Sequence, residues 1–169
     1  MRLILPRITP CALLAFALCM RAQTADPLLH QPAPEFVRSG LNHERIDLSA
    51  YRGKVVLLNF WATWCAPCQT EMPRLVRWQR RYRKAGLQVI GISMDDDADQ
   101  AGTLVRRRRL NYPVLMGDSD LGTQYGEVLG LPVTFLIDRQ GRIAAHFKGE
   151  TSMTVMRREM ERLLREKGE

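Results

Sequence analysis

The sequence predicts an α/β domain in which a central mixed sheet has helices on both faces. Three observations lead to this prediction. The segment 54–61 is a nearly continuous apolar run, which is typical of a strand covered on both faces. Apolar residues at helical spacing then follow over 71–85 and stop at Gly86. Further along the chain the order is strand, helix, hairpin and helix, so both kinds of element contribute to one core.

The later elements follow from the same patterns of apolar residues. In chain order we expect a strand, a helix, a short extended segment, the two strands of an antiparallel hairpin turning at Gly141, and a last helix: 87–93, 99–110, 112–116, 133–138, 142–147 and 153–164. The last helix has Thr151 or Ser152 to cap its start and Gly168 beyond its end.

Length and composition limit the class of protein. The chain has 169 residues, of which 46% are hydrophobic and 25% charged, with 25 Lys and Arg against 18 Asp and Glu. One compact domain accounts for this length, which excludes a two-domain dinucleotide enzyme. The composition is that of a globular protein, and four cysteines are too few for a disulfide scaffold.

The first 25 residues predict a secretory signal peptide. Arg2 and Arg7 precede an apolar run at 12–20, and small and polar residues follow at 22–25. The uninterrupted run has nine residues, against the roughly 20 that a transmembrane helix needs, and an uncleaved anchor stays open as the alternative. Cleavage would remove Cys11 and Cys19 and leave 22 basic against 18 acidic residues, a net charge of +4.

Two segments precede the core strand. Residues 26–34 hold three prolines and little apolar periodicity, and we interpret them as a linker. Residues 36–51 alternate weakly and contain Gly40 and Asn42, which predicts an N-terminal β-hairpin ahead of the main sheet. The expected organisation is therefore a signal peptide at 1–25, a linker at 26–34 and one domain at 35–169, placed in the periplasm or another exported location.

The chemistry is expected between the first core strand and its helix. Cys65, Ala66, Pro67 and Cys68 lie where the strand ends and the helix opens. A helix N-terminus favours the thiolate, which is the reactive form of cysteine, so Cys65 is the candidate nucleophile. Cys68 lies one turn deeper on the same helix face and can attack a mixed disulfide on Cys65. The pair predicts a redox-active disulfide and no other cofactor.

Three other interpretations of the cysteine pair compete with redox exchange. A closed zinc site needs about four ligands, whereas the mature chain offers two cysteines and three histidines without the usual spacing. A structural disulfide across two residues closes too short a loop to stabilise much. A peroxidatic cysteine would need an upstream proline that is missing beside Thr63. Disulfide exchange is the interpretation that the residues favour.

Three segments together resemble the TlpA/ResA branch of the thioredoxin superfamily: Leu48 to Lys54 (LSAYRGK), Asn59 to Cys68 (NFWATWCAPC) and Gly130 to Asp138 (GLPVTFLID). The resemblance runs from about Ala33 to the C-terminus. It implies a thioredoxin-like fold and an exported or membrane-tethered thiol-disulfide oxidoreductase. Members of this branch often reduce apocytochrome c before haem attachment, and a membrane protein then supplies the electrons.

The resemblance also implies roles for single residues. Pro132 matches a cis-proline beside the dithiol, and Pro73 matches a proline that kinks the active-site helix. Asn59 stands where cytosolic thioredoxins place a buried Asp. Glu71, three residues after Cys68, is the candidate replacement, which would exchange a proton with the Cys68 thiol. A solvated first-turn glutamate is the alternative for Glu71.

We therefore expect an exported disulfide reductant in which Cys65 attacks, Cys68 resolves and Glu71 moves a proton. Trp64, Leu131 and Pro132 should form the surface that docks substrate. A general periplasmic disulfide oxidase or isomerase, and a copper chaperone using the two thiols, are the alternatives. The expected partners are proteins bearing thiols or disulfides, with no nucleic acid, and the protein is expected to be a monomer. The arginines around 77–83 and 106–109 are interpreted as solvated helix faces.

Overall fold

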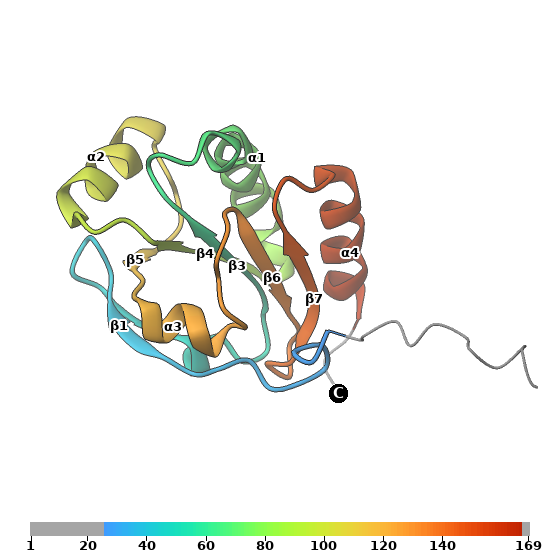
Figure 1. The fold of residues 1–169 in the computed structure, drawn as a ribbon. Helices are drawn as coiled ribbons and strands as arrows, with labels where there is room; N and C mark the ends of the chain where they lie inside the picture. The colour runs from blue at the N-terminus through green and yellow to red at the C-terminus, as the bar shows by residue number, and fades with distance from the viewer. Residues whose placement is uncertain (1–25, 167–169) are drawn as a thin grey trace, which may run out of the picture.

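A computed structural model describes residues 26–166, so the predicted signal peptide lies outside the described residues. Its centre is a five-stranded sheet in the order β5-β4-β3-β6-β7 (Figure 1). The strands are β3 (Val55–Trp61), β4 (Leu87–Ser93), β5 (Val114–Met116), β6 (Val133–Ile137) and β7 (Ile143–Lys148). β3, β4 and β5 run parallel, whereas β6 pairs antiparallel with both β3 and β7. The predicted mixed sheet is confirmed.

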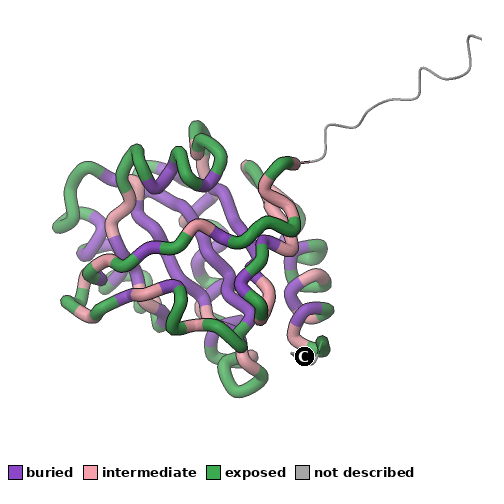
Figure 2. The backbone as a smooth tube through the Cα atoms, turned by 90° about the horizontal axis from the view of Figure 1, so that it is seen from below, coloured by how far each residue is buried: buried purple, intermediate pink, exposed green. Residues whose placement is uncertain are grey.

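Helices cover both faces of this sheet, as the sequence predicts. The larger core packs α1 (Ala66–Tyr82), α2 (Ala98–Arg108) and α4 (Met153–Arg165) against one face. The other face is covered by α3 (Ser119–Gln124) and by the segment before β3. Figure 2 shows the central strands buried along their length, with exposed residues on the outward sides of the helices. All seven residues of β3 are buried, because the sheet is covered on both faces there.

The predicted N-terminal hairpin is present and attached to the sheet. It consists of β1 (Val37–Ser39) and β2 (Arg45–Asp47), followed by the 3₁₀ turn η2 (Leu48–Tyr51). At its tip the backbone N–H of Leu41 donates to the carbonyl of Val114 in β5 (2.8 Å). The hairpin therefore covers the edge of the sheet at β5, which would otherwise expose unpaired backbone groups.

Residues 26–34, predicted as a linker, make backbone contacts with the start of β7. The N–H of His30 donates to the carbonyl of Ile143 (2.7 Å), and Ile143 donates in turn to the carbonyl of Gln31 (2.9 Å). Ala33 donates to the carbonyl of Gly141 (2.9 Å) and is buried. The prolines prevent a regular strand, but this segment still pairs with β7.

Within residues 26–166 no helix is long and apolar enough to cross a membrane.

The helices depart from the prediction mainly at α1 and α3. α1 begins at Ala66, five residues before the apolar periodicity that predicts a helix over 71–85, and its last predicted residues form the 3₁₀ turn η3 (Arg83–Ala85). The short helix α3 was not predicted, because six residues carry too little periodicity to stand out. The Asp118 side chain caps α3 by accepting from the N–H of Leu121 (2.8 Å).

Candidate active site

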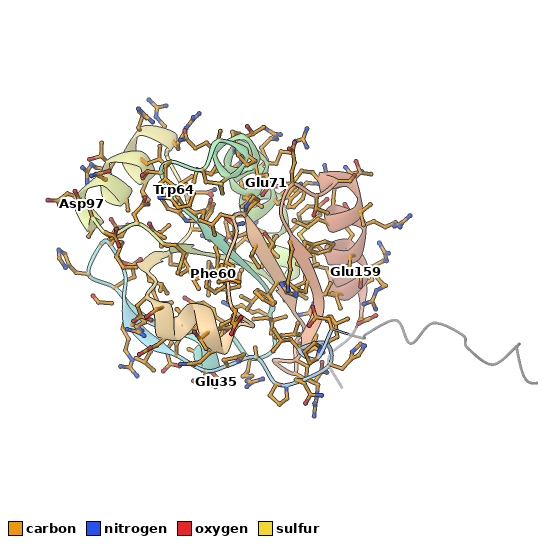
Figure 3. The ribbon with its side chains drawn as sticks, viewed as in Figure 1. Glu35, Phe60, Trp64, Glu71, Asp97 and Glu159 are labelled. Atoms are coloured by element: carbon orange, nitrogen blue, oxygen red, sulfur yellow. A yellow bond between two sulfur atoms is a disulfide. The ribbon has the colours of Figure 1, made fainter. Side chains whose placement is uncertain are left out.

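The cysteines lie where the buried strand β3 gives way to α1. Figure 3 shows Trp64 and Glu71 at the same end of the molecule, beyond the carboxyl end of β3. Four residues, 62–65, connect Trp61 at the end of β3 to the start of α1 at Ala66. Because β3 is paired on both sides, this short connection has little freedom, and it holds the cysteines at the edge of the sheet.

Cys65 and Cys68 form a disulfide, with their Cα atoms 5.3 Å apart. Cys65 is the N-cap of α1, and its sulfur accepts from the backbone N–H of Cys68 (3.3 Å). After reduction, the same N–H and the helix dipole would stabilise a thiolate on Cys65. Both cysteines are buried. A partner must therefore approach through the residues that surround the disulfide.

The loop before Cys65 is held by the buried side chain of Asp95, which follows β4. Both carboxylate oxygens of Asp95 accept from the backbone N–H of Thr63 (3.0 Å each), and Oδ1 also accepts from the Thr63 hydroxyl (2.7 Å). The hydroxyl of Ser93 donates to Oδ2 of the same carboxylate (2.7 Å). Two residues upstream of Cys65, the backbone is thus fixed to the end of the neighbouring strand.

The remaining polar group of Thr63, its carbonyl, is bound from the helix side. It accepts from Nε2 of Gln69 (2.7 Å), whose Oε1 in turn accepts from the guanidinium of Arg108 at the end of α2 (2.7 Å). No role was predicted for Thr63, Gln69 or Asp95, and Arg108 was interpreted as part of a solvated helix face. The sequence gives one signal for Asp95, the polar run Asp95 to Asp97 after a buried strand. That run does not show which of the three carboxylates turns inward.

Glu71 is buried on the first turns of α1 and is 6% exposed. Its Oε2 atom is buried and has no hydrogen-bond partner among the described residues. Burial, followed by repulsion from Glu150, raises the pKa of Glu71 to about 7, and Arg74 opposes this rise. The carboxyl can therefore gain or lose a proton near neutral pH. This environment differs from the solvated glutamate that the sequence left open.

The predicted docking residues differ in exposure. Trp64 is 72% exposed, whereas Leu131 is half-buried and Pro132 is buried. The Leu131–Pro132 peptide bond is cis, as the resemblance implies. The carbonyl of Pro132 accepts from the N–H of Gly149 (2.8 Å). Trp64 thus offers most of the apolar surface, and the Pro132 backbone is tied to the chain beyond β7.

The side chain of Asn59 carries no charge. Its side chain is buried in β3, and Nδ2 donates to the hydroxyl of Thr134 in β6 (2.9 Å). An amide here stabilises the pairing of the two strands but cannot accept a proton from a thiol at neutral pH. Glu71, three residues after Cys68, is the buried carboxyl of α1.

The described part of the chain, residues 26–166, contains no group of three or more His, Cys, Asp or Glu side chains arranged to hold a metal ion.

The Asp95 contacts lead to a prediction on stability. Asp95→Ala leaves the N–H and hydroxyl of Thr63 without their acceptor, and should lower the free energy of unfolding by about 1 to 3 kcal/mol. Asp96→Ala, at an exposed neighbour without such contacts, should change it by less than about 0.5 kcal/mol. Urea titration of both variants measures the difference. Equal losses would show that the Asp95 contacts contribute no stability of their own.

Comparisons with known proteins agree with this geometry. Residues 29–146 match the AhpC/TSA family. The thiol-disulfide oxidoreductase ResA of Bacillus thuringiensis subsp. konkukian is 36% identical over 119 residues, covering 70% of this chain and 68% of ResA. ResA of Geobacillus kaustophilus is 33% identical over 129 residues, covering 76% of this chain and 74% of that protein.

Solved structures show the same fold. A thiol:disulfide interchange protein of the thioredoxin family from Chlorobium tepidum TLS superposes with a TM-score of 0.74 at 27% identity, covering 83% of this chain and 99% of that one. A DsbF homologue from Corynebacterium diphtheriae superposes with a TM-score of 0.73 at 28% identity, covering 82% of this chain and 90% of that one. The chain therefore belongs to the AhpC/TSA family, has a thioredoxin-like fold, and is a thiol-disulfide oxidoreductase whose cysteine pair is Cys65 and Cys68.

Proposed function

We propose that this oxidoreductase is an exported reductant of protein disulfides, and that its substrates include apocytochrome c. The observation that favours reduction is the buried carboxyl of Glu71 on the helix that carries both cysteines. Strong oxidants of this class owe their potential to a stabilised reduced form. Here Ala66 and Pro67 separate the cysteines and offer no cation, and a carboxylate at Glu71 disfavours further negative charge nearby. The thiolate is less stabilised, so the disulfide form is favoured.

The proposed reaction transfers two electrons to the substrate. The Cys65 thiolate attacks one sulfur of a substrate disulfide, which forms a mixed disulfide and releases the other substrate sulfur as a thiolate. The Cys68 thiol then passes its proton to the Glu71 carboxylate and attacks the Cys65 sulfur. The Cys65–Cys68 disulfide forms, the substrate leaves with both sulfurs reduced, and a membrane electron-donor protein restores the dithiol.

The docking surface follows from exposure. Trp64 provides an exposed apolar ring directly before Cys65, and the cis peptide at Leu131–Pro132 turns the loop before β6. We propose that an extended substrate segment lies across Trp64, Leu131 and Pro132. The ring of Trp64 would exclude water around the mixed disulfide. The loop before β6 would orient the sulfur–sulfur bond of that mixed disulfide.

The reduction potential of the Cys65/Cys68 couple tests the direction of electron flow. We expect a value near the low end of the range that related dithiols span, about −270 to −120 mV. Equilibration with glutathione or dithiothreitol buffers, followed by thiol labelling, measures it. A value near the high end would favour the general oxidase or isomerase instead. Stoichiometric Cu(I) or Zn(II) retained through reducing purification would favour the thiol-based metal chaperone.

The roles of the two cysteines can be separated by trapping. Cys68→Ser removes the resolving thiol, so the mixed disulfide on Cys65 should accumulate and be released by dithiothreitol. Cys65→Ser is the matched control, and it should trap far less because Cys68 lies deeper in the helix. Non-reducing electrophoresis after incubation of each reduced variant with the disulfide form of apocytochrome c measures both. The absence of any adduct with Cys68→Ser would contradict the exchange mechanism.

The pH dependence tests the role of Glu71. The rate of substrate reduction should rise as Glu71 ionises, with a midpoint near its pKa of about 7, because only the carboxylate can accept the Cys68 proton. Glu71→Gln should abolish this rise. Stopped-flow measurement of the rate from pH 5 to 9 gives the profile. An unchanged profile would rule out proton transfer through Glu71.

Two further variants should move the midpoint in opposite directions. Glu150→Gln removes a negative charge that raises the pKa of Glu71, so the midpoint should fall. Arg74→Gln removes a positive charge that lowers the pKa of Glu71, so the midpoint should rise.

The pH dependence of the free energy of unfolding provides an independent check on the raised pKa of Glu71. A raised carboxyl pKa stabilises the protein fully below pH 4.5, and that contribution is lost as the pH rises through about 7.

A further inference from the structure

The second half of α1 forms a basic groove with α4. The groove has a volume of about 470 Å³ and contains five arginines, four from α1 and one from α4, together with Trp78, Tyr82, Met153 and Thr154; the arginines are Arg74, Arg77, Arg80, Arg81 and Arg157. The four on α1 are all exposed, whereas Trp78 and Met153 are mostly buried. Guanidinium groups thus line a hollow together with two mostly buried apolar side chains, Trp78 and Met153.

The arginines of α1 and α4 differ in their partners. On α4, Arg157 lies 4.0 Å from Glu161, and Arg162 contacts both Glu159 and Glu166. None of the four α1 arginines of the groove has a carboxylate within 4.0 Å among residues 26–166. After Glu71, α1 contains no acidic residue at all. Apart from the attraction between Arg74 and Glu71, the positive charge of this helix is therefore uncompensated among the described residues.

This arrangement is unfavourable for the helix itself. Arg74 and Arg77 are three residues apart, and Arg77 is three and four residues from Arg80 and Arg81. Like charges at these spacings lie side by side on a helix and destabilise it. Of the acidic groups on neighbouring segments, Glu161 is hydrogen-bonded to Tyr82, and Glu71 is attracted by Arg74 and repelled by Glu150. Arg77, Arg80 and Arg81 have no carboxylate within 4.0 Å among the described residues, so an external anion would relieve the repulsion.

We propose that this groove binds an acidic polypeptide segment of the protein partner with which the dithiol exchanges electrons. A guanidinium donates two parallel hydrogen bonds to a carboxylate, which suits Asp and Glu side chains. The groove is concave and lies between two helices, whereas a membrane surface would favour a flat or protruding basic patch. The identity of the partner rests on the proposed function, but the binding of an acidic segment does not.

The position of the groove supports a partner of the active site. Arg74 lies three residues after Glu71 and six after Cys68 on the same helix. Six residues of helix span about 9 Å, so a segment in the groove can continue to the cysteines as an extended chain. Attraction between opposite charges would also speed the encounter of the two proteins.

Binding of a defined peptide tests the proposal. The probe is a fluorescein-labelled peptide of alternating Glu and Ser, about twelve residues long, compared with the same peptide carrying Gln for Glu. Anisotropy is measured with the oxidised protein, which keeps binding separate from disulfide exchange. We expect saturable binding of the Glu peptide at about 50 mM NaCl, weakening with added salt, and at least about tenfold weaker binding of the Gln peptide.

Two matched charge reversals locate the binding site. Arg77→Glu with Arg81→Glu should weaken binding of the Glu peptide at least about tenfold. Arg106→Glu with Arg107→Glu makes the same change in net charge on α2, which lies across α1 from α4 in Figure 1, and should weaken it less than about threefold. Circular dichroism checks that each variant folds. If the Arg77→Glu, Arg81→Glu variant fails to fold, Arg77→Gln with Arg81→Gln replaces it.

Three results would overturn the proposal. The first is that the Glu peptide does not bind. The second is that both double variants weaken binding equally. The third is that vesicles of phosphatidylcholine with phosphatidylglycerol bind through Arg77 and Arg81 while the peptide does not. The last result would assign the groove to a lipid surface. The proposed function fails separately, through a high reduction potential or the absence of a trapped adduct, and neither measurement depends on the groove.

Discussion

The complete burial of β3 is the constraint on which the rest of the structure depends. This strand is paired on both edges and covered on both faces, so its end is fixed within the sheet. The chain reaches α1 four residues later, and Asp95 binds Thr63 midway along that connection. Cys65 therefore caps α1 at a position that the sheet, the β4 terminus and the helix determine together. The reactivity of Cys65 follows from that placement.

Charge is distributed unevenly along α1, and this unevenness links the chemistry to recognition. At its start, the helix dipole favours a thiolate on Cys65, while the buried carboxyl of Glu71 opposes further negative charge. Beyond Glu71 the helix is basic, from Arg74 to Arg81, and faces the groove against α4. One helix thus carries the nucleophile, the proposed proton acceptor and the proposed docking surface, in that order along its length.

Much of the fold could be predicted because the strands and long helices bury many residues with a regular period. The strand 87–93 was predicted with the bounds that the structure has, since Leu87, Val89, Ile90 and Ile92 give it a clear apolar pattern. Where fewer residues are buried, the pattern was too weak. α3 buries Leu121 and Gly122 within six residues, and the segment before the hairpin pairs with β7 through backbone groups, which leave no trace in side-chain periodicity.

By itself, the sequence determined the cysteine pair and its place between strand and helix, since spacing is a local property of the chain, and its resemblance to a known family implied the cis bond before Pro132. Only the tertiary structure decided the environment of these residues. The sequence allowed a solvated Glu71, but the packing of α1 buries it, and repulsion from Glu150 adds to the effect of burial on its pKa. The sequence did not distinguish Asp95 from Asp96 and Asp97, but the structure shows that Asp95 accepts from the Thr63 hydroxyl. Burial and hydrogen bonding between distant segments depend on how elements pack, and they set the pKa of a carboxyl and the rigidity of a loop.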